Sequence, residues 1–134
     1  MKKELSYMDS VHRDGRIWNL SVMVLLILFP ISVALIYHAM PDWRGFLMGI
    51  IATAPMYWAV AVVETVTYVP MLGAGGSYLS FVTGNIANLK LPVALNALEQ
   101  AEVSVSSEEG EIVSTIAIAV SSIVTTLIII LGVI

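Results

Sequence analysis

Four stretches of the chain carry no charged side chain, and this feature limits the possible folds more than any other. Residues 17–41, 45–63 and 112–134 are apolar over most of their length. A helix needs about 20 predominantly apolar residues to cross the hydrocarbon core of a bilayer. The fourth stretch, residues 65–89, is interrupted by one proline, four glycines and two asparagines. Irregular backbone in a membrane protein is tolerated only where protein buries it or where it lines a wet cavity. The sequence therefore predicts an integral membrane protein whose functional segment lies at the interrupted stretch.

The composition also favours the membrane class. The chain is 58% hydrophobic and only 12% charged, whereas a soluble domain carries about 25% charged residues. The net charge is −4 and no basic patch occurs, so we expect no nucleic-acid partner. Without cysteine, the chain has no thiolate metal site and no cysteine nucleophile. His12 and His38 lack metal-ligand spacing, and no catalytic motif is present, so we expect neither an enzyme nor a bound cofactor.

The distribution of charge predicts both the layout and the orientation. Four of the six basic residues precede residue 17, so the positive-inside rule predicts a cytoplasmic N-terminus. The expected location is the inner membrane. The first apolar run is longer than a signal-peptide core, so we expect it to remain as a spanning helix. We expect a cytoplasmic N-terminal segment over residues 1–16 and a hairpin of two spanning helices over residues 17–69. A re-entrant broken helix over residues 70–103, an acidic loop over residues 104–111 and a third spanning helix over residues 112–134 follow.

The interrupted segment is expected to enter and leave the bilayer on one side. Pro70 is expected to end the second span, and the glycine-rich residues 73–76 form a hinge. Residues 77–83 then form a half-helix of roughly 10 Å, too short to cross. A turn at residues 84–85 and a second half-helix complete the segment. The predicted fold class is all-α, with three transmembrane helices, a broken re-entrant hairpin and an oligomeric assembly. A fourth full crossing over residues 72–98 is the alternative.

Glu64 is the first candidate site residue. An acid within a span costs roughly 2.5–3.5 kcal/mol on insertion scales at the bilayer centre, so it usually faces protein or water. Glu64 is therefore a candidate to bind a proton, a cation or a substrate amine. The alternative is that Glu64 lies near the interface or pairs with Lys90.

The turn of the broken segment is the second candidate. A turn held inside a membrane offers free N–H groups and carbonyls at the ends of half-helices, which bind anions or dehydrate sodium. Thr83, Gly84 and Asn85 form this turn, and Asn88 follows three residues after Asn85, on the same face if the segment is helical. The alternative is a surface loop with turn-forming asparagines.

Hydroxyl side chains on the third span are the last candidates. Ser121 and Thr125 share one stripe of the helix, and Ser122 lies beside it. These side chains are candidates to line a pathway. The interpretation that we favour is close packing between helices, where small polar residues are common.

Residues 76–98, GSYLSFVTGNIANLKLPVALNAL, resemble the re-entrant hairpins of ion-coupled carriers of the elevator type. The shared pattern is a small-residue turn, here T-G-N, followed by a run that ends in L-P. The resemblance covers about 23 of the 134 residues. It implies that solute and coupling-ion contacts lie at Ser80, Thr83, Asn85 and Asn88.

Three spans and a hairpin cannot enclose a transport path alone, so we expect a homo-oligomer or a second membrane subunit as partner, within the lipid bilayer. The leading hypothesis is a small transporter, or a transporter subunit, for a small polar solute, with Na⁺ or H⁺ as the candidate coupling ion. One alternative is an oligomeric channel lined by the third span. The other is a non-transporting assembly or regulatory subunit that meets a partner through residues 99–111.

Overall fold

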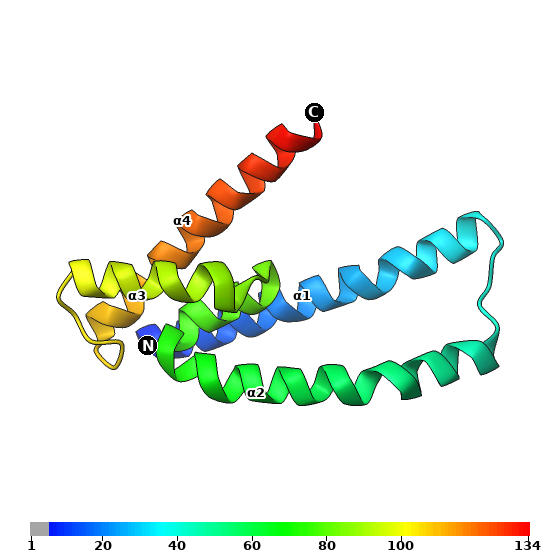
Figure 1. Ribbon diagram of the computed structural model, residues 1–134, viewed down its shortest axis with the longest axis horizontal. Coiled ribbons are helices and arrows are strands. Elements are labelled where there is room, and N and C mark those ends of the chain that lie inside the picture. The colour runs from blue at the N-terminus through cyan, green and yellow to red at the C-terminus, as the bar shows by residue number, and fades with distance from the viewer. Residues whose placement is uncertain (1–5) are drawn as a thin grey trace, which may run out of the picture.

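The computed structural model describes residues 6–134, which are almost entirely helical (Figure 1). No strand occurs within this range, which confirms the predicted all-helical class. The first two helices form a long antiparallel hairpin, and the last helix extends away from the packed end of the molecule (Figure 1). The elements in chain order are α1 (Tyr7–Ile36), α2 (Trp43–Thr83), the short π-helix η1 (Ile86–Lys90), α3 (Leu91–Gln100) and α4 (Glu108–Val133).

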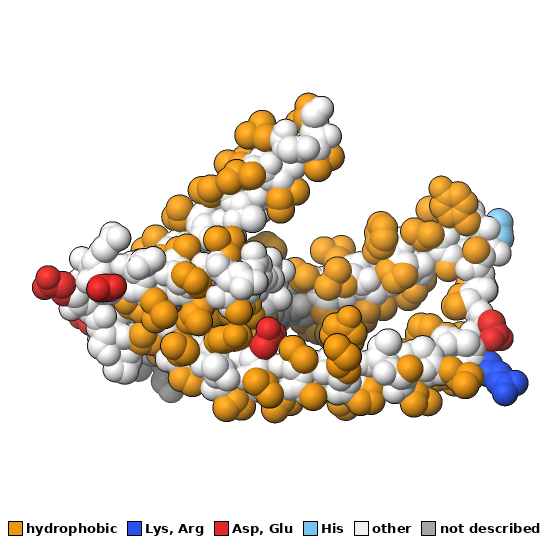
Figure 2. All heavy atoms as spheres, in the orientation of Figure 1, with side chains coloured by type: hydrophobic (Ala, Val, Ile, Leu, Met, Phe, Trp, Pro, Cys, Tyr) orange, Lys and Arg blue, Asp and Glu red, His pale blue; other side chains and the backbone are white. Residues whose placement is uncertain are grey.

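Three of these helices, α1, α2 and α4, are long and apolar enough to cross a membrane. Three helices of sufficient length and hydrophobicity were predicted, and their presence is consistent with a membrane protein. Hydrophobic side chains cover the hairpin and the free length of α4. Most charged side chains visible in this view lie at the two ends of the molecule, and one acidic side chain lies in the middle of the face (Figure 2). Large side chains such as Trp58 and Leu131 are about three-quarters exposed. A surface of this kind is expected to face lipid or another chain.

The helix boundaries differ from the expected ones: α4 begins at Glu108, inside the loop expected at residues 104–111, and two further differences concern α1 and α2. α1 begins at Tyr7, so most of the polar N-terminal segment belongs to the first helix. α2 continues through Pro70 and breaks at Gly73, where φ is 74° and ψ is 174°. Proline removes one backbone donor but leaves φ helical, whereas the conformation at Gly73 is one that glycine adopts without a steric cost. The break therefore falls at the glycine rather than at the proline.

The caps of α2 and α4 have clear causes in the sequence. Asp42 caps α2, because its carboxylate accepts a hydrogen bond from the Gly45 N–H at 2.9 Å. At α4 the cap is Ser107, whose hydroxyl oxygen accepts from the Gly110 N–H at 3.0 Å. A cap at Ser106, with Glu109 as its partner, would also fit the sequence, and the structure places it one residue later.

Beyond Gly73 the chain forms a hairpin of short helices over residues 74–100, which we name the inner hairpin. The last part of α2 runs to Thr83, and the chain turns at Gly84 and Asn85, with φ of 69° and 55°. η1 and α3 then return without an interruption between them. Both legs of the inner hairpin pack on α4 (Figure 1).

α4 is held against the inner hairpin by close backbone approach. A Cβ atom on Gly75 would lie 2.5 Å from Thr115 Oγ1, and one on Gly76 would lie 2.8 Å from Ile118 Cδ1. The small core lies at this contact and consists of four buried side chains, Leu72, Ile86, Ala94 and Ile118. The inner hairpin and the first half of α4 therefore form the packed unit of the molecule.

Candidate functional site

A cavity of about 130 Å³ lies between the turn of the inner hairpin and the middle of α4. The turn contributes three residues, η1 contributes two, and α4 contributes the rest. Seven of the lining residues have polar side chains or lie in the turn itself, and the other two are apolar. The lining residues are Thr83, Gly84, Asn85, Leu89, Lys90, Ser122, Thr125, Thr126 and Ile129.

Lys90 is the charged group of this cavity, and its side chain is only 2% exposed. Its Nζ donates a hydrogen bond to Ser122 Oγ at 2.8 Å. The Ser122 hydroxyl also lies 3.3 Å from Thr83 Oγ1 and donates to the Ile118 carbonyl at 2.7 Å. Through Ser122, these contacts connect η1, α2 and α4 at a single point.

Lys90 lies outside the three long helices, in the short η1 segment. Over residues 6–134, the only ion pair within 4.0 Å joins Arg13 to Asp14, so no carboxylate of this range neutralises Lys90. In particular, Glu64 does not pair with Lys90, and that interpretation of Glu64 finds no support in the structure.

The structure brings several predicted site residues together at the cavity. Thr83, Gly84 and Asn85 line it from the turn, and Ser122 and Thr125 line it from α4. Asn85 and Thr125, which are 40 positions apart in the chain, both line the cavity because the inner hairpin packs on α4. Asn85 has a left-handed backbone conformation, so its side chain does not continue the face of the helix that follows.

Other predicted residues lie elsewhere. Asn88 is exposed and does not line the cavity. Ser80 is fully buried one turn before Gly84, and its hydroxyl has no hydrogen-bond partner within residues 6–134. Glu64 is half-buried on α2, well before the break at Gly73.

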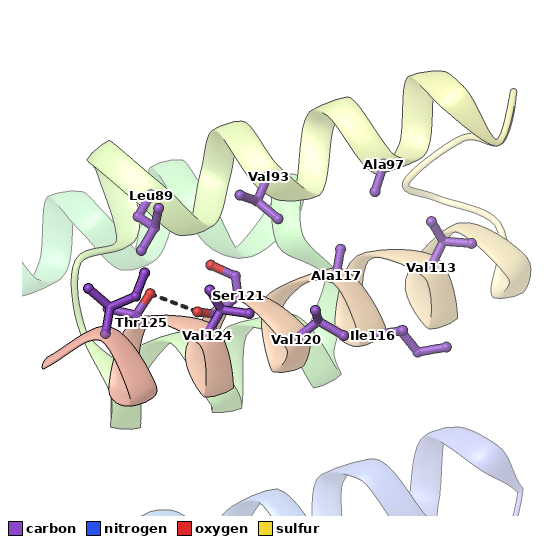
Figure 3. A pocket seen from close by; sticks show the side chains of 11 residues that line it. Leu89, Val93, Ala97, Val113, Ile116, Ala117, Val120, Ser121, Val124 and Thr125 are labelled. Atoms are coloured by element: carbon purple, nitrogen blue, oxygen red, sulfur yellow. Dashed lines mark hydrogen bonds between the residues drawn. The ribbon is translucent and has the colours of Figure 1, made fainter. Parts of the chain in front are cut away.

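Ser121 lines a different depression, an apolar groove of about 650 Å³ between α3 and α4 (Figure 3). Figure 3 shows Leu89, Val93 and Ala97 above this groove and the residues of α4 below it. The Thr125 hydroxyl donates to the Ser121 carbonyl at 2.7 Å. The groove therefore has little polar chemistry to offer, in contrast to the cavity beside Lys90.

Lys90 is the site residue that the sequence interpretation did not single out. A signal for it exists, because Lys90 is the only charged residue between Glu64 and Glu99. A charged residue within an apolar stretch of a membrane protein is a candidate functional residue by default. Its burial against Ser122 depends on the packing of α4, which the sequence does not reveal.

Glu111 is a second buried charge with a different role. Its Oε1 accepts hydrogen bonds from the N–H groups of Ala74 and Gly75, at 2.9 and 3.2 Å. The break at Gly73 frees these N–H groups, as at any helix N-terminus. Glu111 thus caps the second part of α2 from another helix. Ser114 adds a bond from its hydroxyl to the Leu72 carbonyl at 2.8 Å.

A polar contact also joins α1 to the inner hairpin. The Asn19 side chain donates to the carbonyls of Gly15 and Tyr78, at 2.9 and 3.3 Å. The Tyr78 hydroxyl lies 3.3 Å from His12 Nδ1. These contacts fix the position of the inner hairpin between α1 and α4.

Over residues 6–134, the fold and the cavity define an all-helical chain with three helices of membrane length and a polar cavity, lined by the buried Lys90, at the turn of a helical hairpin. Comparison with known protein families, with curated proteins and with solved structures found no match to this chain.

Proposed function

We propose that the chain is a small inner-membrane transporter, or the subunit of one, and that it carries a small polar solute by way of the cavity beside Lys90. The observation that supports this most is the position of a polar cavity at the turn of the inner hairpin. Lys90 is buried there with one hydrogen-bond partner, and a buried charge is costly unless further partners, such as those of a bound solute, complete its hydrogen bonds.

The depth of the cavity along α4 supports the proposal. Glu111 contacts the chain at the break, and Ser122 contacts it at the turn. These residues are eleven positions apart on α4, which corresponds to roughly 16 Å at 1.5 Å per residue. The hydrocarbon core is about 30 Å thick. If α4 crosses the membrane, the turn lies near the midplane, as is common for the sites of secondary transporters.

The exposure of the long helices favours an assembly. The most apolar windows of α1 and α2 are not buried at all within the chain. Over residues 6–134, the inner hairpin packs against only two helices besides α2, namely α1 and α4. We therefore propose that a second copy or another membrane subunit completes the path and that the N-terminus faces the cytoplasm.

The charge at the site constrains any coupling ion. A sodium ion in the cavity would lie close to the Lys90 ammonium, and two like charges repel strongly where water is scarce. We therefore place possible proton coupling at Glu64, the only acid within residues 43–83.

The test is uptake by the purified protein in liposomes, with a panel of small neutral, anionic and cationic solutes. We expect saturable uptake of at least one solute. Replacing Thr83→Val together with Asn85→Ala is expected to lower that uptake at least tenfold, because both residues line the cavity. Asn88→Ala is the matched control, because Asn88 is exposed and outside the cavity. Currents without saturation would favour the channel. No flux, with a second protein co-purifying in fixed ratio, would favour the assembly subunit.

A further inference from the structure

Lys90 presents an imbalance of charge that the chain itself does not resolve. Its ammonium has three N–H donors, and only one of them has a partner in residues 6–134, the hydroxyl of Ser122. No carboxylate of that range lies within 4.0 Å. A buried cation is strongly disfavoured unless it is paired and hydrogen-bonded.

The other polar groups around the cavity do not supply the missing negative charge. The hydroxyls of Thr83, Thr125 and Thr126 donate to carbonyls of their own helices at 2.7–2.9 Å. Asn85 lines the cavity and adds a side-chain amide with two further donors. The free donors at the cavity therefore belong to Lys90 and Asn85, one charged and one neutral.

We infer that the cavity beside Lys90 binds a small singly charged anion, of the class of short carboxylates, with Lys90 as its counter-charge and Asn85 as a second donor. This inference rests on the proposed function and specifies the charge of the solute. An anion would accept hydrogen bonds from the unused N–H donors and would also neutralise the charge of the ammonium. A neutral solute would leave the charge of Lys90 unbalanced, and a cation would be repelled.

The size of the cavity limits the anion. A cavity of about 130 Å³ has room for several water molecules. Formate, acetate or chloride fits entirely within this volume. A longer organic acid fits only through its carboxylate end, with the remainder in the direction of the membrane or of a partner subunit.

The experiment is calorimetric titration of the purified full-length protein with sodium acetate, sodium formate and sodium chloride. Acetamide is the matched neutral ligand, because it has nearly the shape of acetate without its charge. We expect acetate or formate to bind and acetamide not to bind. Binding of chloride alone would replace the carboxylate with a halide as the guest and so overturn the carboxylate class.

Variants then locate the binding. Lys90→Met is expected to lower the acetate affinity at least tenfold, whereas Lys90→Arg retains part of it. Ser122→Ala is expected to weaken binding, because it removes the hydroxyl that positions the ammonium, and Ser121→Ala is the control in the apolar groove. If Lys90→Met does not fold, Asn85→Ala and Ser122→Ala carry the test. Equal acetate affinity in these variants and in the unaltered protein would overturn the inference.

Failure of this inference can be distinguished from failure of the proposed function. Acetate binding without any uptake in liposomes would retain the anion site and remove the transporter. Saturable uptake of a neutral solute that Lys90→Met leaves unchanged would retain the transporter and remove the anion site.

Discussion

Glu111 and Lys90 are both buried charges beside interruptions of helical structure, but their partners differ. Glu111 is 8% exposed and accepts two backbone N–H bonds. Lys90 is 2% exposed and has one hydroxyl partner. The acid thus acts within the fold, because it satisfies donors that the break at Gly73 leaves open. Lys90, in contrast, keeps two N–H donors that can bind a ligand.

Removing the Glu111 carboxylate is expected to destabilise the second part of α2. Glu111→Ala leaves two N–H groups of Ala74 and Gly75 without their acceptor, at a cost of about 1–3 kcal/mol. Glu111→Gln keeps a carbonyl acceptor and loses only the favourable interaction of the charge with the helix N-terminus, about 0.3–1 kcal/mol. Thermal unfolding in detergent and hydrogen exchange at residues 74 and 75 measure both effects.

The control for Glu111 is Glu108→Ala, which removes an exposed acid from the same turn of α4. In the Glu108→Ala variant, the hydrogen-exchange rates at residues 74 and 75 should match those of the unaltered protein. Equal exchange in Glu111→Ala and Glu108→Ala would show that the cap does not hold the inner hairpin.

At the scale of elements, the contact between the inner hairpin and α4 depends on glycines that have no space for a side chain. Gly75 and Gly76 are buried, and α4 presents Thr115 and Ile118 to them. Small residues allow such close approach between helices in membranes, where no hydrophobic effect drives association. The position of Lys90 against Ser122 follows from this contact.

Gly75→Ala is expected to separate α4 from the inner hairpin. The added Cβ would lie 2.5 Å from Thr115 Oγ1, so the helices must shift, at a cost of about 1–3 kcal/mol. Gly49→Ala is the matched control in the same helix α2, because a Cβ there meets nothing within 4 Å. The control should gain stability by up to about 1 kcal/mol. Thermal unfolding of both variants measures the difference, and a loss of the same size in Gly49→Ala would contradict the packing argument.

The elements differ in how far the sequence predicts them. The length of the apolar runs is enough to predict the helices α1, α2 and α4. The residue types Gly84 and Asn85 are enough to predict the turn. The break at Gly73 is harder to place, because Pro70 precedes it by three residues and both are helix-breaking residues. The cap from Glu111 and the contact of Lys90 with Ser122 join segments more than 30 residues apart. Such contacts depend on the packing of α4, and no local pattern encodes them.

At the scale of the whole molecule, the chain is an open frame rather than a closed bundle. α1 and α2 separate toward residues 37–42, and α4 extends alone beyond the packed end (Figure 1). Most of the apolar surface of these arms is exposed. The frame is expected to be filled by lipid or by other chains, which is why the proposed path belongs to an assembly.

The layout of the frame predicts which loops share a side of the membrane. α1 and α2 run in opposite directions, and Gly73, where the inner hairpin begins, contacts Glu111 near the start of α4. If the inner hairpin does not cross, residues near Asp9 and Ser106 lie on one side and Ala39 lies on the other. Because the chain has no cysteine, each engineered cysteine is a unique label. Single variants Asp9→Cys, Ala39→Cys and Ser106→Cys, all at exposed positions, are suited to an impermeant maleimide.

In intact cells, we expect labelling of Ala39→Cys only, and in inverted membrane vesicles labelling of Asp9→Cys and Ser106→Cys. The physical reason is that two crossings return the chain to its starting side and the inner hairpin leaves it there. If residues 72–98 crossed the membrane fully, Ser106→Cys would be labelled together with Ala39→Cys. That single change of side would remove the argument that places the turn and Lys90 near the midplane, since the cavity depth depends on a hairpin that enters and leaves from the same side.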